Sequence, residues 1–183
     1  GTKAKSAIHT APQRTTKGSA ILGCLASSAD PRVLENETGA NVPIIGKGWE
    51  LEVKRLGVQR HGSQRRTYGA YQVFIDGHPV DGLTGNMCES IGPGDNSKRD
   101  NGKRVEAGTY PLWTQFGRYR SIGYSGGPDS MRGLRLEGSG NRTGILIHPG
   151  HPPTLYLSSV GCLNPTAALT SDQSMAFPDS RAR

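Results

Sequence analysis

Residues 49–54 read WELEVK and residues 71–77 read YQVFIDG, and these two stretches decide the fold class. In the first, apolar side chains alternate with polar ones, and in the second Tyr71, Val73 and Ile75 take alternate positions, which is the pattern of a strand with one buried face. The second stretch runs into Asp76-Gly77, a dipeptide typical of a two-residue hairpin turn. The two stretches therefore predict half-buried strands joined by tight turns, and not helices.

Weaker signals of the same kind continue along the chain. Residues 83–91 and 105–116 are expected to be extended, with a polar loop at 92–102 between them. Leucines 134 and 136 and isoleucines 145 and 147 alternate with other residues in two further short strands. Turn signals recur about every ten residues, which favours a sandwich or barrel over alternating strands and helices. The expected fold class is mainly β.

Composition excludes several other architectures. The chain has 183 residues, of which 26 are glycine and 12 are proline. Both are poor helix formers, and no G-x-y period indicates collagen. No run approaches the roughly 20 apolar residues that a membrane-spanning helix needs. We expect a tail or linker at 1–47, with at most one short helix, followed by one domain at 48–183.

Net charge and cysteine content narrow the classes of partner and of site that the chain can have. The formal net charge is +7, which suits an anionic partner such as nucleic acid, a membrane surface or a bacterial wall polymer. The cysteines are Cys24, Cys88 and Cys162, an odd number, so at least one is expected to be a free thiol. No CxxC pair occurs, which argues against zinc ribbons and thioredoxin-like sites.

The stretch with the most chemistry is residues 144–165, GILIHPGHPPTLYLSSVGCLNP. A cysteine nucleophile needs a nearby base, partial exposure and hydrogen-bond donors for the developing oxyanion. Either His148 or His151 can serve as the base for Cys162, and Gly161 leaves room for a substrate carbonyl. An ion pair with a histidine would lower the pKa of the Cys162 thiol, so that it reacts with alkylating agents before Cys24 and Cys88.

Two other interpretations of the same residues remain open. Cys162 can be an inert buried thiol, as many free cysteines are. His148, His151 and Cys162 can also bind zinc, although the sequence offers no evident fourth ligand.

The segment resembles a known active site. Residues 159–164, SVGCLN, match five of the six positions of the signature Ser/Thr-His-Gly-Cys-hydrophobic-Asn of L,D-transpeptidases, the YkuD-type catalytic domain. Residues 147–150 resemble the upstream Ile-His-Gly of that family, with Pro149 inserted, and residues 104–111 resemble its T-P-x-G-x-Y/F segment. The resemblance covers residues 50–166 and implies an L,D-transpeptidase-like β-sandwich with short helices and long loops.

The resemblance also implies residue roles. Cys162 matches the nucleophile and His148 the loop histidine that acts as its base. Ser159 and Gly161 match the residues that shape the nucleophile turn, and Asn164 closes the motif as a candidate substrate-binding residue.

Two departures from the family pattern bear on activity. Val160 replaces the histidine that usually lies two residues before the cysteine, and the gap of 14 residues between His148 and Cys162 is short. His151 is a candidate for the role vacated at Val160. Strict transpeptidation is the part of the family's chemistry that these departures put in question.

The implied substrate is the peptidoglycan stem peptide. Cys162 would form a thioester, which an amine resolves in transpeptidation or D-amino acid exchange and water resolves in L,D-carboxypeptidase activity. Arg132 and Arg135 are candidates for binding acidic groups of the peptide. No cofactor or metal is implied.

The resemblance also suggests a cellular setting. The expected location is periplasmic or secreted, with a leader absent from this sequence or with delivery by a secretion system. If the protein is an anti-bacterial effector, an immunity protein is a further expected partner.

Two alternatives come from other functional classes. The first is a non-catalytic cell-wall-binding module in which Cys162 is only structural. The second is a basic nucleic-acid-binding domain, suggested by basic pairs at 54–55, 60–61, 65–66, 98–99 and 103–104. Aromatic residues make up only 6% of the chain, too few for evident stacking platforms, so nucleic acid is not the expected partner.

Overall fold

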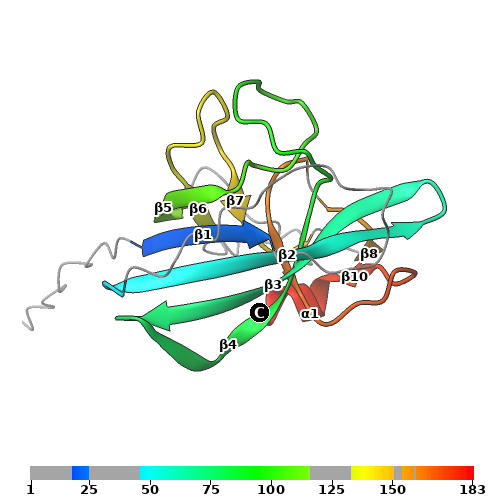
Figure 1. The fold of residues 1–183 in the computed structure, drawn as a ribbon. Coiled ribbons are helices and arrows are strands. Elements are labelled where there is room, and N and C mark those ends of the chain that lie inside the picture. Colours follow the sequence, from blue (N-terminus) through cyan, green and yellow to red (C-terminus); the bar gives the residue numbers. More distant parts are fainter. Residues whose placement is uncertain (1–17, 25–45, 116–132, 151–153, 159) are drawn as a thin grey trace, which may run out of the picture.

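The computed structural model describes residues 18–24, 46–115, 133–150, 154–158 and 160–183 (Figure 1). This part of the chain contains ten strands and one short helix, so the predicted mainly β class is confirmed. None of its helices is long and apolar enough to cross a bilayer.

Eight strands form one sheet, in the order β7-β6-β5-β1-β2-β3-β4-β9. Neighbouring strands are antiparallel, except that β1 and β2 are parallel. The strands are β1 (Gly18–Cys24), β2 (Trp49–His61), β3 (Gln64–Ile75), β4 (His78–Glu89), β5 (Gly108–Gln115), β6 (Gly133–Leu136), β7 (Leu146–Ile147) and β9 (Asn164–Thr166). A second, two-stranded sheet pairs β8 (Thr154–Leu155) with β10 (Met175–Ala176), and α1 (Phe177–Arg181) follows it.

The two ends of the large sheet meet. A parallel bridge joins Ile147 in β7 to Leu163, the residue before β9. The His148 N–H donates to the Leu163 carbonyl at 3.0 Å, and the Leu163 N–H donates to the Leu146 carbonyl at 2.8 Å. The sheet therefore closes around its core, and the more specific L,D-transpeptidase-like sandwich stays a prediction.

The core lies inside this closed sheet. Its members come from β2 to β7, from the segments between them and from the residue before β9: Leu51, Val53, Tyr71, Met87, Val105, Tyr110, Leu112, Leu136, Ile145, Ile147 and Leu163. The alternation predicted for residues 49–53 is present in part, because Leu51 and Val53 are buried in this cluster while Glu50, expected on the polar face, is buried as well. Burial of one face of each strand is what holds the sheet in register.

The hairpin expected at Asp76-Gly77 is present between β3 and β4. Both residues have positive φ, 49° and 81°, which is the backbone of a type I′ turn. The Asp76 N–H donates to the Gly48 carbonyl at 2.7 Å, and the Gly48 N–H donates to the Asp76 carboxylate at 2.7 Å. These bonds tie the turn to the start of β2.

Strand β1 corrects the expectation for residues 1–47. Its residues were assigned to a tail or linker with at most a short helix, yet they form a strand between β2 and β5. Ala20, for example, is aligned with Leu51 on one side and with Tyr110 on the other. Its seven residues carry no alternating pattern, so ladder pairing with two neighbours, and not local sequence, determines this strand.

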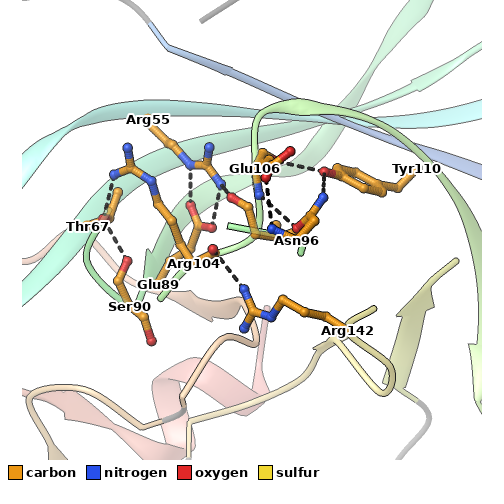
Figure 2. A network of polar contacts seen from close by, with 10 residues as sticks. Arg55, Thr67, Glu89, Ser90, Asn96, Arg104, Glu106, Tyr110 and Arg142 are labelled. Atoms are coloured by element: carbon orange, nitrogen blue, oxygen red, sulfur yellow. Dashed lines mark hydrogen bonds and ion pairs between the residues drawn. The ribbon is translucent and has the colours of Figure 1, made fainter. Parts of the chain in front are cut away.

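A buried polar network fixes the loop between β4 and β5 (Figure 2). The Arg55 guanidinium binds Glu89 through two hydrogen bonds of 2.9 Å and donates to the Val105 carbonyl at 2.8 Å. The Arg104 guanidinium donates to the Thr67 hydroxyl at 2.9 Å. Arg55 and Glu89 are both almost fully buried, so loss of either partner would leave the other charge without its counter-ion.

The tip of the same loop is bound to the base of β5. Asn96 and Glu106 exchange hydrogen bonds between side chain and backbone at 2.9 and 3.2 Å. The Asn96 amide also donates to the Tyr110 hydroxyl at 2.9 Å, and that hydroxyl donates to the Glu106 carbonyl. Hydrogen bonds therefore fix the position of this loop both near its tip and where it enters β5.

The C-terminal segment packs against the β2–β3 hairpin through Arg66. Its guanidinium donates to the Tyr156 and Thr170 carbonyls, each at 3.1 Å, and its Cζ lies 4.1 Å from the centre of the Tyr156 ring. In α1, the Ser180 hydroxyl donates to the Pro165 carbonyl and accepts from the Gly150 N–H. These contacts bring the C-terminal residues over the loop that follows His148.

Candidate functional site

The bridge between β7 and the residue before β9 determines which side chains of these two segments point into the core. Ile147 and Leu163 belong to the core cluster, so their chain neighbours point away from it. The bridge therefore brings His148, which follows Ile147, and Cys162, which precedes Leu163, onto adjoining segments. One strand spacing and a two-residue step separate their Cα atoms by about 8 Å, a span that an imidazole and a thiol side chain can bridge.

The Cys162 thiol is partly exposed and contacts backbone groups. Its Sγ accepts a hydrogen bond from the Leu146 N–H at 3.4 Å, and the S–H lies 3.8 Å from the Gly144 carbonyl oxygen. Burial raises the pKa of this thiol, and the Leu146 N–H and the Arg142 charge lower it by less. The expectation that a histidine lowers this pKa is therefore wrong for the resting protein, because desolvation of the sulfur is the largest effect.

The His148 ring has a defined orientation. Its Nδ1 lies 2.7 Å from the Pro149 carbonyl oxygen. A carbonyl oxygen only accepts, so this bond requires the proton on Nδ1 and leaves the lone pair of the neutral ring on Nε2. The inserted Pro149 therefore supplies the group that sets the tautomer of His148.

Asn164 holds His148 from the neighbouring strand. Its Nδ2 donates to the His148 carbonyl at 2.9 Å and lies 3.5 Å from Nδ1 of the ring. The Asn164 side chain is fully buried. Its place is that of a residue that positions His148, and not that of the predicted substrate contact, because a fully buried amide presents no surface to a ligand.

Gly161 is required by its surroundings. Its φ of 126° lies in a region that side-chain-bearing residues rarely adopt. A Cβ built there would lie 2.0 Å from Nη2 of Arg142. Gly161 thus lets a buried guanidinium pack directly on the backbone next to Cys162, in addition to the access for substrate that the sequence suggested.

Arg142 is the site residue that sequence reasoning missed. It is 4% exposed, and its Nη1 donates to the Arg104 carbonyl at 2.8 Å (Figure 2). In the sequence it sits within SGNRTG, residues 139–144, which reads as an ordinary polar turn. No motif spacing singles it out, since its proximity to Cys162 comes from the closure of the sheet.

Arg135 lies on β6 opposite Leu146, whose N–H binds the Cys162 sulfur. Its guanidinium forms an ion pair with Glu137, and its buried Nε makes no hydrogen bond within the described residues. A hollow of about 290 Å³ adjoins it, lined by Arg135, Leu136, Glu137, Gly138, Ser139, Gly140, Arg142, Thr143 and Gly144. Arg142 and Gly144 link this hollow to Cys162.

Three predicted site residues, His151, Ser159 and Arg132, lie outside the described residues. Val160, at the position of the family's second histidine, has 74% of its surface exposed. Within the described ranges, no three His, Cys, Asp or Glu side chains gather closely enough to hold a metal ion.

The basic pairs do not form one solvent-facing patch. Arg55, Arg66 and Arg104 are buried and donate hydrogen bonds to carboxylate, hydroxyl and carbonyl oxygens of the fold. Three of the five basic pairs therefore present only their other member to an anionic partner, whereas both members of the pairs at 60–61 and 98–99 are exposed.

Comparisons of the chain with models of known protein families, with curated proteins and with solved structures found no match. The function of this site is therefore argued from its geometry and from the motif in residues 144–165.

Proposed function

We propose that the protein is a cysteine acyl-transfer enzyme that acts on peptidoglycan stem peptides. The observation that carries the proposal is the bridge between Ile147 and Leu163, which brings His148 and Cys162 onto adjoining segments, with Nδ1 of the imidazole bound to the Pro149 carbonyl. A nucleophile, a base and a third group that orients the base are the parts that covalent acyl transfer needs. The resemblance of residues 159–164 to the L,D-transpeptidase signature supplies the substrate class.

The chemistry proceeds in two steps. In the first, Nε2 of His148 takes the thiol proton while the Cys162 sulfur attacks the amide carbonyl of the stem peptide. The C–N bond then breaks, and the imidazolium gives its proton to the departing amine of the terminal D-amino acid. In the second step, an amine or water attacks the thioester, which releases the thiol and forms a crosslink, an exchanged peptide or a trimmed peptide.

The raised pKa of Cys162 is compatible with this sequence of events. A thiol that is protonated at rest does not react with oxidants and electrophiles as a free thiolate does. The base then removes the proton when the substrate is in place, as in general-base activation of other nucleophiles. The Leu146 N–H, already bound to Sγ, stabilises the sulfur as negative charge develops.

The proposed substrate implies a place and partners for the protein. Peptidoglycan is reached from the periplasm or from outside the cell, so we propose a periplasmic or secreted enzyme. If it serves as an anti-bacterial effector, the cell that makes it needs an immunity protein against it. The catalytic unit would extend beyond residues 48–183 to include β1, because that strand lies between β2 and β5 in the sheet.

The direct test is incubation of the purified, reduced protein with disaccharide tetrapeptides, followed by chromatography and mass spectrometry. We expect release of the terminal D-alanine, or its exchange for an added D-amino acid. Cys162→Ala should abolish the product, and His148→Ala should lower the rate at least about a hundredfold. Cys88→Ala and His78→Ala are the matched controls and should retain activity. An unchanged peptide profile with the thiol confirmed as reduced would contradict the proposal.

One observation favours a second candidate, a non-catalytic wall-binding module. The Cys162 thiol is largely desolvated, and burial raises its pKa, as expected of a structural cysteine. In that case the wild-type protein and Cys162→Ala would bind isolated cell walls equally, and neither would change the peptide profile.

A further inference from the structure

The nucleophile has a buried positive charge beside it. The backbone carbonyl of Gly144 and the guanidinium of Arg142 come from the same short segment, and they contact Cys162 and Gly161 respectively. Nη2 of Arg142 lies where the Cβ of any other residue at 161 would be. Its charge is close enough to act on the Cys162 thiol, in the direction that favours the ionised sulfur.

The position of Arg142 is fixed from two sides. Its Nη1 donates to the Arg104 carbonyl at 2.8 Å, a bond to the network that anchors the β4–β5 loop (Figure 2). Its own backbone is held by Ser139, whose hydroxyl donates to the Arg142 carbonyl at 2.7 Å. The next residue back is bound to the loop as well, since the Asn141 N–H donates to the Asn96 carbonyl at 2.9 Å. A guanidinium held this way has little freedom to leave the site.

The charge of Arg142 is not neutralised by an ion pair with any described residue. Among the described residues no carboxylate forms an ion pair with Arg142, in contrast to Arg55, which Glu89 neutralises. Asp95 is near enough for Arg142 to help lower its pKa, but that carboxyl is exposed to solvent and is bound chiefly by Ser97. Buried charges act through a lower effective dielectric than exposed ones, so the field of Arg142 at the sulfur is weakly screened.

We propose that Arg142 is a positioning residue of the Cys162 site, whose fixed charge stabilises the negative charge that forms on Sγ. This inference rests on the proposed function, because it gives Cys162 the role of nucleophile. It also explains why residue 161 is glycine. The motif turn must let a guanidinium approach the backbone beside the sulfur, and a Cβ would exclude it.

The other charged and titratable groups near the sulfur act differently. His148 lies on the adjoining segment and serves as the base in the proposed function, so its charge appears only after it has taken the proton. The Arg104 guanidinium is directed toward Thr67 and contributes its backbone carbonyl to Arg142. Arg142 therefore supplies the permanent charge and His148 the transferable proton.

The test measures the rate at which iodoacetamide alkylates Cys162 between pH 6 and pH 10, by peptide mass spectrometry and without peptidoglycan. An opposite charge in close contact typically favours the ionised form by one or more pKa units. Arg142→Gln should therefore slow alkylation about tenfold at neutral pH and move its pH profile toward higher pH. Arg142→Lys keeps the charge and should stay within about threefold of the wild type.

Arg66→Gln is the matched control, because it also removes a buried guanidinium but one that acts on Cys88 and Tyr156. Its Cys162 profile should not move. Equal profiles for the wild type and a folded Arg142→Gln, or equal slowing in Arg66→Gln, would overturn the inference. If Arg142→Gln does not fold, Arg142→Met and Arg142→Lys are compared in its place, and only the lysine variant should keep the profile.

This readout separates the inference from the function on which it rests. A thiol whose reactivity depends on Arg142, in a protein that leaves muropeptides unchanged, would contradict the peptidoglycan activity alone. Muropeptide processing that Arg142→Gln leaves intact would contradict the role of Arg142 alone.

Discussion

Gly161→Ala is the substitution that tests the packing of the site most directly. The new Cβ would lie 2.0 Å from Nη2 and 3.2 Å from Cζ of Arg142, and 3.4 Å from Cδ1 of Ile145. The backbone at 161 has φ 126°, so the alanine is strained even if the arginine moves away. The guanidinium must leave its position, because the contact is far shorter than real Cβ contacts.

The expected cost has two parts. A residue with a side chain in a sparsely populated φ region costs about 1–3 kcal/mol. Displacement of Arg142 breaks its charged hydrogen bond to the Arg104 carbonyl, and such bonds contribute about 1.5–3 kcal/mol. We therefore expect the free energy of unfolding to fall by about 4 kcal/mol in total, a large share of the stability of a domain of this size.

Gly57→Ala separates strain from the clash. Gly57 also has a positive φ, 157°, but a Cβ at that position would have no heavy atom within 4 Å. Its cost should be limited to the backbone term, at most about 2 kcal/mol. Urea denaturation followed by fluorescence gives both values. A difference of less than about 1 kcal/mol between the two variants would refute the claim that Arg142 packs on Gly161.

Three further predictions concern the groups around the site. Glu89→Gln should lower the free energy of unfolding by about 3–5 kcal/mol, because the buried Arg55 loses its counter-ion; a loss below 1 kcal/mol in urea titration would show that the pair is not needed. Asn164→Ala removes the amide that holds His148. It should lower the free energy of unfolding by about 1–3 kcal/mol and slow any acyl transfer. An unchanged free energy of unfolding and an unchanged rate would together contradict the positioning role of Asn164. Burial raises the pKa of the Cys88 thiol to about 11, so this thiol ionises in the unfolded chain at a lower pH than in the folded protein. The free energy of unfolding should therefore fall as pH rises from about 9 toward 11. Cys88→Ala should lack this part of the fall, and parallel pH curves for the two proteins would contradict the prediction.

Much of the fold was predictable from local patterns. Leu51 and Val53 alternate with polar neighbours because one face of β2 is buried, and Asp76-Gly77 forms the turn that those residues favour. The strands with such signals were found. β1 was not, because its position between β2 and β5 depends on hydrogen bonds from residues far away in the sequence.

The candidate site, like the fold, was predictable only in part. Cys162 and His148 stand out because few residue types carry this chemistry and because the motif between residues 159 and 164 is short. The raised pKa of Cys162 and the burial of Asn164 were not predictable, since both depend on what the closed sheet places around them. The anchoring of Nδ1 of His148 depends on the backbone path at Pro149.

The sequence by itself determined a mainly β protein with a cysteine and a histidine on adjoining extended segments, because strand periodicity, turn residues and short motifs are local properties. Only the tertiary structure decided that the ends of the sheet meet next to His148 and Cys162, and that Arg142 packs on Gly161. The physical reason is that a buried charge acts through space. Residues 142 and 161 become neighbours only when the chain has closed around its core.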